Sequence, residues 1–292
     1  FFFKQKTAYE IVDCDWSSDV CSSDLMATPL DELFQKVRSE NRAALIAYMP
    51  AGYPSIEGCK RVISALIAGG VDAIEIGFPY SDPVMDGPTI QAAADQSLAQ
   101  GTSAADVFDA LNTATSAGIP AVVMTYWNPI EKYGVEKFAS SIKSHGGSGV
   151  ITPDLTIEES DAWQSAVKNH EINPIYVVAP STSDSRLPQV TSQCGGFVYA
   201  ASLMGVTGAR TEVASSAPAL VARIRKTTDL PVAVGLGVST REQAKGVAGY
   251  ADGVIVGSAF IKALHDAPDE ETGLKTVKEL AQQLALGVRE GR

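Results

Sequence analysis

Residues 72–91 read DAIEIGFPYSDPVMDGPTIQ, an apolar run that continues into a loop with acidic side chains. The nearly continuous apolar run at 71–76 is typical of a strand that is covered on both faces. Glu75 lies inside this run, and Asp82 and Asp86 follow it. Because an unpaired carboxylate in such a strand either costs free energy or takes up a proton, the pattern indicates proton-transfer chemistry.

Working outward from this segment, strand-like apolar runs alternate with helical patterns from about residue 42 onward. The eight predicted strands are residues 43–48, 73–76, 121–126, 149–151, 174–178, 197–200, 231–234 and 253–256. Eight strands that alternate with helices imply parallel strands joined by crossover helices. A single (β/α)8 TIM barrel of α/β class is therefore the predicted fold, and a doubly wound open sheet is the structural alternative.

The helical patterns between these strands carry recognisable start signals. A helix is predicted at residues 29–39, before the first strand, and an apolar stripe at 59–67 predicts another. Thr156-x-x-Glu159 and Ser239-x-x-Glu242 resemble capping boxes, and spaced leucines at 274–284 predict the last helix.

The first 25 of the 292 residues differ from the rest of the chain. We interpret residues 1–25 as translated sequencing-adapter sequence, with a genuine disordered N-terminal arm as the alternative, and residues 26–292 as one barrel domain. Residues 1–25 carry a net charge of −3, which leaves −8 for the other 267 residues. This acidic balance argues against nucleic-acid binding, and no apolar run is long enough for a membrane span.

Cysteine usage points to a reducing compartment. Cys59 and Cys194 are far apart and follow no ligand or disulfide pattern, so we expect a cytoplasmic protein. No metal-binding spacing, Walker motif, dinucleotide fingerprint or hydrolase elbow is present, and we therefore predict no metal and no dinucleotide cofactor.

Glycine-rich loops follow the predicted strands six, seven and eight. Gly235 and Gly237 flank one turn, Gly257 and Ser258 form the next, and GVTG at 205–208 follows strand six. Glycine lets an anion approach the backbone closely, and the loops after strands seven and eight are the usual phosphate site of this barrel class. We predict a phosphate site here, although each turn alone could be an ordinary tight turn.

The two acids in different surroundings have distinct predicted roles. Burial raises the pKa of a carboxyl group, so Glu75 could hold or release a proton near neutral pH. Asp86 could accept a substrate N–H and stabilise developing positive charge. The alternative for Glu75 is a structural carboxylate paired with Lys or Arg inside the barrel. For Asp82 and Asp86 the alternative is turn chemistry, which we favour for Asp82.

Three tyrosines, Tyr48, Tyr126 and Tyr199, end predicted barrel strands. They could form the wall of an aromatic pocket, or they could simply fill the core.

Seven motifs together carry a resemblance to a known family. They are AGYPS, IEIGFPYSDPVMDGPTIQ, YWNPI, TPDL, MGVTGAR, GLGVS and VGSA, in this order. In these motifs the chain resembles the tryptophan synthase alpha subunit over nearly all of residues 26–292. The resemblance implies a lyase that cleaves indole-3-glycerol phosphate to indole and glyceraldehyde 3-phosphate, with Glu75 as the acid-base and Asp86 holding the indole N–H.

The resemblance also implies roles for further positions. Tyr48 and Tyr126 would be pocket walls, and Tyr199 would lie near the reacting end of the substrate. Thr207 and Gly208 would belong to a mobile loop. The phosphate would bind at Gly237, Gly257 and Ser258. Asp82 and Pro83 would lie in the loop that meets a beta subunit. The resemblance implies an alpha2beta2 complex, in which the beta subunit receives the indole for tryptophan synthesis. It also implies that this chain has no cofactor and that pyridoxal phosphate belongs to the beta subunit.

Two other functions remain open at this point. One is a stand-alone indole-releasing lyase or another phosphate-binding barrel isomerase. The other is a non-catalytic partner that only activates the beta subunit, which the presence of both Glu75 and Asp86 argues against.

Overall fold

The computed structural model describes residues 27–201, 210–235 and 237–292. Its strands are β1 Ala44–Pro50, β2 Ala73–Gly77, β3 Ala121–Met124, β4 Gly149–Ile151, β5 Asn173–Ile175, β6 Val177–Val178, β7 Val198–Ala201, β8 Val232–Gly235 and β9 Gly253–Val256. All neighbouring strands pair in parallel, in the order β5-β4-β3-β2-β1-β9-β8-β7-β6.

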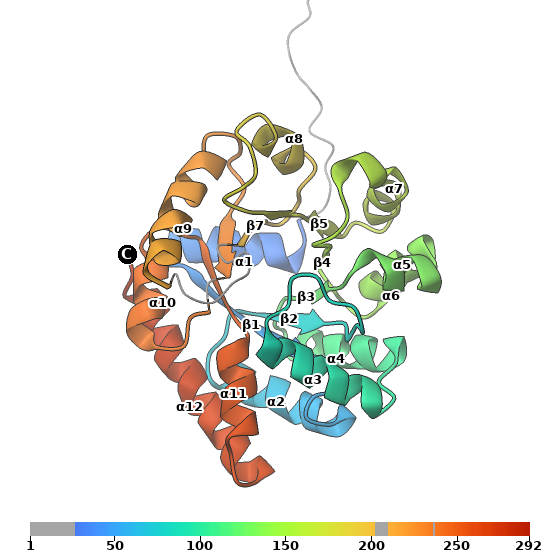
Figure 1. The fold of residues 1–292 in the computed structure, drawn as a ribbon, viewed down its shortest axis with the longest axis vertical. Helices are drawn as coiled ribbons and strands as arrows, with labels where there is room; N and C mark the ends of the chain where they lie inside the picture. The colour runs from blue at the N-terminus through green and yellow to red at the C-terminus, as the bar shows by residue number, and fades with distance from the viewer. Residues whose placement is uncertain (1–26, 202–209, 236) are drawn as a thin grey trace, which may run out of the picture.

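The sheet closes into a barrel because its two edge strands belong to one extended segment. Only Tyr176 separates β5 from β6, so the first and last strands of the sheet are continuous along the chain. The predicted fifth strand at 174–178 is therefore present in two parts. Figure 1 shows the strands around a common centre, with the helices outside them. The predicted (β/α)8 barrel is confirmed, and the open doubly wound sheet is excluded.

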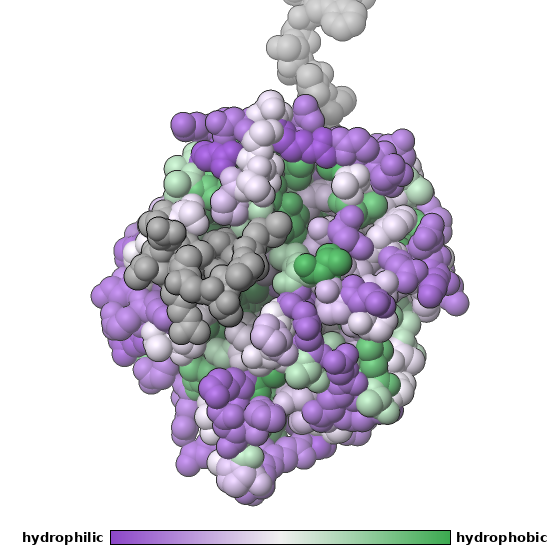
Figure 2. All heavy atoms as spheres, viewed as in Figure 1, coloured by the Kyte–Doolittle hydropathy of each residue, from purple (hydrophilic) through white to green (hydrophobic). Residues whose placement is uncertain are grey.

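The helices surround this barrel. They are α1 Pro29–Ser39, α2 Ile56–Ala68, α3 Pro88–Ala99, α4 Ala104–Ser116, α5 Trp127–Tyr133, α6 Val135–Ser144, α7 Asp161–Asn169, α8 Leu187–Thr191, α9 Arg210–Ile224, α10 Arg241–Ala248, α11 Ser258–His265 and α12 Glu270–Arg289, with a short 3₁₀ helix at Ile157–Glu159. No helix in the described part of the chain is long and apolar enough to cross a membrane. On the face drawn in Figure 2, hydrophilic residues dominate the rim and hydrophobic residues gather nearer the centre.

The two predicted capping boxes are wrong in detail. The capping box at α10 joins Thr240 to Gln243, one residue later than predicted. In it, the Gln243 side-chain oxygen accepts hydrogen bonds from the backbone N–H groups of Ser239 and Thr240. The Thr156 side chain makes no capping bond, and only the 3₁₀ turn follows it before α7 begins at Asp161. By contrast, α1 has the predicted bounds.

Helix α1 closes the end of the barrel at which the strands begin. The rings of Phe34 on α1 and Phe197, just before β7, have centroids 5.6 Å apart. Leu30 packs so closely on Gly196 that a Cβ there would lie 2.8 Å from Leu30 Cδ2. In Figure 1, α1 lies behind the strands. This end is therefore sealed, and the strand ends with the predicted chemistry are at the opposite end.

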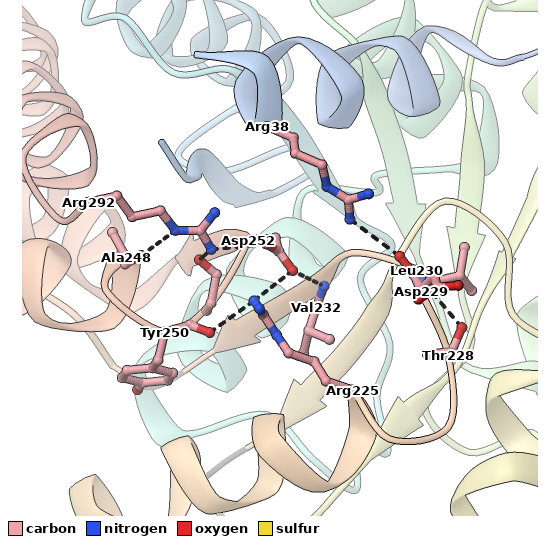
Figure 3. Close-up of polar contacts among 11 residues, drawn as sticks. Arg38, Arg225, Thr228, Asp229, Leu230, Val232, Ala248, Tyr250, Asp252 and Arg292 are labelled. Carbon is pink, nitrogen blue, oxygen red and sulfur yellow. Dashed lines mark hydrogen bonds and ion pairs between the residues drawn. The ribbon is translucent and has the colours of Figure 1, made fainter. Parts of the chain in front are cut away.

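A shared carboxylate holds the start of β8 and the C-terminus together (Figure 3). The Asp252 side chain accepts hydrogen bonds from Arg225 at 3.1 Å, Arg292 at 2.9 Å and the Val232 backbone N–H at 3.0 Å. Its side chain is only 13% exposed. One half-buried acid thus satisfies two cations and a strand N–H, which makes it a structural residue.

We expect Asp252→Ala to lower the free energy of unfolding by about 2 to 4 kcal/mol, because it leaves two arginines and a buried N–H without their acceptor. Urea unfolding would measure the change. Asp266→Ala is the matched control, since Asp266 pairs with exposed Lys262 and its loss should cost much less. Equal losses in the two variants would contradict the assignment.

Candidate active site

Glu75 is a buried carboxylate that has no hydrogen-bond partner among the described residues. It lies in the middle of β2, in register with Tyr48 on β1 and Val122 on β3, and it is 1% exposed. Neither carboxylate oxygen has a hydrogen-bond partner within the described residues. The alternative that a Lys or Arg pairs with Glu75 inside the barrel therefore has no support in this part of the chain.

This environment changes the acidity of Glu75. Burial in the barrel, and secondly the negative charge of Asp86, raise the pKa of Glu75 to about 8. Glu75 is consequently protonated in much of the population at neutral pH and can still release its proton, which is the property that a combined general acid and base needs.

Asp86 is anchored rather than free in its loop. The Tyr126 hydroxyl donates to Asp86 Oδ2 at 3.2 Å, and the Met85 N–H donates to the same hydroxyl at 3.2 Å. The Gln91 side chain donates to the Asp86 carbonyl at 2.7 Å. Burial raises the pKa of Asp86, while the hydrogen bond from Tyr126 opposes the rise. Turn chemistry alone does not account for these contacts, and the charge of Asp86 contributes to the raised pKa of Glu75, so the two carboxylates lie near each other.

Glycines at the strand ends make room for two tyrosine rings. Tyr48 and Tyr199 are 7% and 8% exposed. A Cβ at Gly77 would lie 2.3 Å from the Tyr48 hydroxyl oxygen, and one at Gly235 would lie 2.5 Å from that of Tyr199. A Cβ at Gly257 would lie 2.8 Å from Tyr48 Cδ1. Gly235 and Gly257, predicted as phosphate residues, thus also have a packing reason to be glycine.

The strand ends predicted to hold phosphate lie side by side, since β8 and β9 pair. Gly257 directly precedes α11, which begins at Ser258 and has no side-chain cap. Gly237 is exposed and has a positive φ of 66°. Of these two turns, only the one at Gly257 leads directly into a helix, because α10 begins later, at Arg241, and Thr240 caps it. The positive dipole end of α11 therefore faces this site.

Two predicted site residues, Thr207 and Gly208, lie outside the described residues. Tyr126 and Tyr199, by contrast, lie in the same barrel mouth as the acids: Tyr126 contacts Asp86, and the charge of Glu75 contributes to the raised pKa of Tyr199 after burial. Glu75 and Tyr199 belong to strands that are not neighbours, so they approach each other across the barrel interior.

The loop after β2 is exposed beyond the acids. Asp82 is exposed and accepts a hydrogen bond from the adjacent Ser81 at 2.5 Å, which fits the turn interpretation. Pro83 is half-buried, and Val84 is 77% exposed. Val84 is therefore an exposed apolar side chain next to the two residues predicted to meet a beta subunit.

Sequence reasoning missed three contributors to the site. Gly77 lies two residues after Glu75 on the same strand face, a spacing that could have identified it. Gln91 and Asn128 left no such signal: Gln91 tethers Asp86, and Asn128 donates to the Tyr80 hydroxyl at 2.9 Å. Among the described residues, no group of three or more His, Cys, Asp or Glu could hold a metal ion.

A cavity of about 420 Å³ lies away from this site. Thr28, Lys168, Asn173 and Cys194 are among its lining residues. These positions surround the start of β5, at the end of the barrel opposite to Glu75 and Asp86, so the cavity is not part of the candidate active site.

Comparisons with known proteins agree with this geometry. A family model described as tryptophan synthase alpha chain matches residues 34–289. The tryptophan synthase alpha chain of Streptomyces avermitilis is 52% identical over 263 residues, covering 90% of this chain and 95% of the relative. That of Thermobifida fusca is 51% identical, covering 90% of this chain and 98% of the relative.

Solved structures give the same result. A structure of Mycobacterium tuberculosis tryptophan synthase superposes with a TM-score of 0.84 at 47% identity, covering 90% of this chain and 99% of that chain. The alpha subunit from Legionella pneumophila gives 0.81 at 30% identity, covering 89% and 98%. With this coverage, and with Glu75 and Asp86 together in the barrel mouth, the chain belongs to the tryptophan synthase alpha chain family.

Proposed function

We propose that this protein is a lyase that cleaves indole-3-glycerol phosphate to indole and glyceraldehyde 3-phosphate. The observation that carries the proposal is the unpaired Glu75 carboxylate, with its pKa raised to about 8, beside the anchored carboxylate of Asp86. A retro-aldol cleavage needs one group that both gives and takes a proton and another that stabilises positive charge.

Glu75 performs the proton transfers. A proton is added to indole C3, which leaves positive charge on the ring nitrogen. The hydroxyl on the chain carbon joined to the ring then loses its proton and becomes the aldehyde oxygen. The electrons of the broken carbon–carbon bond return to the indole ring and restore its aromaticity. Each acid-base step contributes about 10²–10⁴-fold to the rate.

Asp86 holds the indole N–H and stabilises the cationic ring. The hydroxyl of Tyr126 fixes the carboxylate from one side, which favours a preorganised acceptor. Tyr48, Tyr126 and Tyr199 supply the aromatic walls of the pocket.

The phosphate binds at the adjacent ends of β8 and β9. Gly235, Gly237, Gly257 and Ser258 offer backbone groups there, and the uncapped N-terminus of α11 favours an anion. Thr207 and Gly208, which lie outside the described residues, are assigned to substrate binding by the family resemblance alone. Binding the remote phosphate supplies energy that positions the reacting end of the substrate.

The chain works with a tryptophan synthase beta subunit in an alpha2beta2 complex and passes indole to it for tryptophan synthesis. This chain needs no cofactor of its own, and pyridoxal phosphate belongs to the beta subunit. Two free cysteines, Cys59 and Cys194, are consistent with our placement of the enzyme in the cytoplasm. Exposed Val84, next to Asp82 and Pro83, supports the loop after β2 as the contact surface.

The direct test is indole formation from indole-3-glycerol phosphate by the purified chain, alone and with a beta subunit. We expect slow cleavage alone and faster cleavage in the complex. Full turnover without any partner would instead indicate a stand-alone lyase. No cleavage in either case, with a stimulated beta subunit, would indicate a non-catalytic activator.

The contact surface gives a separate prediction. Val84→Ser should weaken association with the beta subunit roughly 10-fold, because an exposed apolar side chain loses its burial at the interface. Calorimetry would measure the affinity. Leu286→Ser is the matched control, since Leu286 is 40% exposed on α12. If both variants bind as well as the wild type, the contact surface lies elsewhere.

A further inference from the structure

The Tyr48 side chain connects the two halves of the candidate site. Tyr48 lies on β1, the strand between β9 and β2. One edge of its ring fills the space over Gly257, at the end of β9, and its hydroxyl lies over Gly77, at the end of β2. The ring therefore extends from the proposed phosphate site toward the strand that carries Glu75.

The Tyr48 side chain is 7% exposed, and its hydroxyl is not one of the fully buried unpaired atoms of the described residues, so its tip remains accessible from the barrel mouth. The ring alone would fill the space over Gly77 and Gly257, so packing does not require the hydroxyl. The hydroxyl also remains a donor, since burial and the nearby charges of Asp86 and Glu75 raise the pKa of Tyr48. The hydroxyl is therefore available to donate a hydrogen bond to a ligand in the barrel mouth.

The other tyrosines do not combine these features. The Tyr126 hydroxyl already donates to Asp86 and accepts from Met85. The Tyr199 hydroxyl lies over Gly235 at the end of β8, on the side of the phosphate loops away from β2. Tyr48 alone among the three lies on the strand between Gly257 and Glu75.

This inference rests on the proposed function. A substrate with its phosphate at Gly257 and its ring at Glu75 must extend its three-carbon chain across the end of β1. We propose that the Tyr48 hydroxyl donates a hydrogen bond to a hydroxyl of this polyol chain. Tyr48 is thus a specificity-determining residue that distinguishes a polyol phosphate from a plain alkyl phosphate.

The test compares two ligands in Tyr48→Phe. Indole-3-glycerol phosphate carries both chain hydroxyls, and 3-indolylpropyl phosphate has the same ring and phosphate without them. We expect kcat/KM for indole-3-glycerol phosphate to fall roughly 3- to 10-fold, as for loss of one neutral hydrogen bond, and the affinity for 3-indolylpropyl phosphate to stay unchanged. Retained binding of the second ligand also shows that the variant folds.

Tyr176→Phe is the matched control. It removes another buried tyrosine hydroxyl, one that accepts a hydrogen bond from Gln164, away from the site. An equal loss for both ligands in Tyr48→Phe would assign Tyr48 a packing role and overturn the inference. An unchanged kcat/KM for indole-3-glycerol phosphate in Tyr48→Phe would also overturn it. In both cases, cleavage by the wild type would leave the proposed function intact. Absence of cleavage by the wild type, alone and with a beta subunit, would refute both.

Discussion

Replacing Glu75 with Gln is expected to lower kcat for indole release by about 10²–10⁴-fold, with little change in substrate affinity. The amide keeps the size of the side chain but can neither deliver a proton to indole C3 nor take one from the substrate hydroxyl. Stopped-flow or steady-state indole detection would measure kcat, and calorimetry would measure binding of the uncleaved substrate. Glu131→Gln, an exposed substitution on α5, is the matched control.

The same variant should be more stable than the wild type at high pH. In the wild type, the folded state holds the Glu75 proton up to about pH 8, whereas the unfolded chain releases it near 4.5. Stability from this group is therefore complete below pH 4.5 and lost as the pH rises to 8. The Gln variant has no such loss, so its advantage should grow across this window by about 3 to 5 kcal/mol.

Urea unfolding at pH 5 and pH 9 would measure this difference. A variant with normal turnover would show that Glu75 is not the acid-base. A constant stability gap between the two pH values would show that Glu75 is ionised throughout, and would remove the physical basis for its role as a proton donor.

Much of this site follows from local sequence. A strand buried on both faces in a parallel barrel needs a continuous apolar run, so Glu75 stood out within its strand. Alternation of strands and helices identified the barrel, and the rule that barrel chemistry lies at the strand ends placed Asp86 and the glycine loops near Glu75. These inferences need only neighbouring residues and a general topology.

Features that depend on distant residues were not predictable in this way. The Asp252 carboxylate meets Arg225 and Arg292, which are far from it in the chain, and nothing in the local pattern pairs them. The spacing from Glu75 could place Gly77 at the site, but the reason that it is glycine appears only when Tyr48 is placed on the adjacent strand. The capping box at α10 shifted by one residue because Ser239 and Thr240 are both good caps, and the position of Gln243 selects between them.

Asp86→Asn is expected to lower kcat by about 10²–10³-fold, the usual effect of removing one preorganised electrostatic group. Asparagine retains the shape and an acceptor for Tyr126, but it loses the negative charge that stabilises the cationic indole ring. Indole release would measure the change. Asp95→Asn, an exposed carboxylate on α3, is the matched control and should behave as the wild type.

This variant also tests the link between the two acids. Burial is the main cause of the raised pKa of Glu75, and the charge of Asp86 is the second. Removing that charge should lower the pKa of Glu75 while burial keeps it above its ordinary value. The limb of the pH–rate profile that belongs to Glu75 should therefore move to lower pH in Asp86→Asn. A reduced kcat with no shift of this limb would mean that the two acids act independently. A near-normal kcat would mean that Asp86 serves only to form the turn.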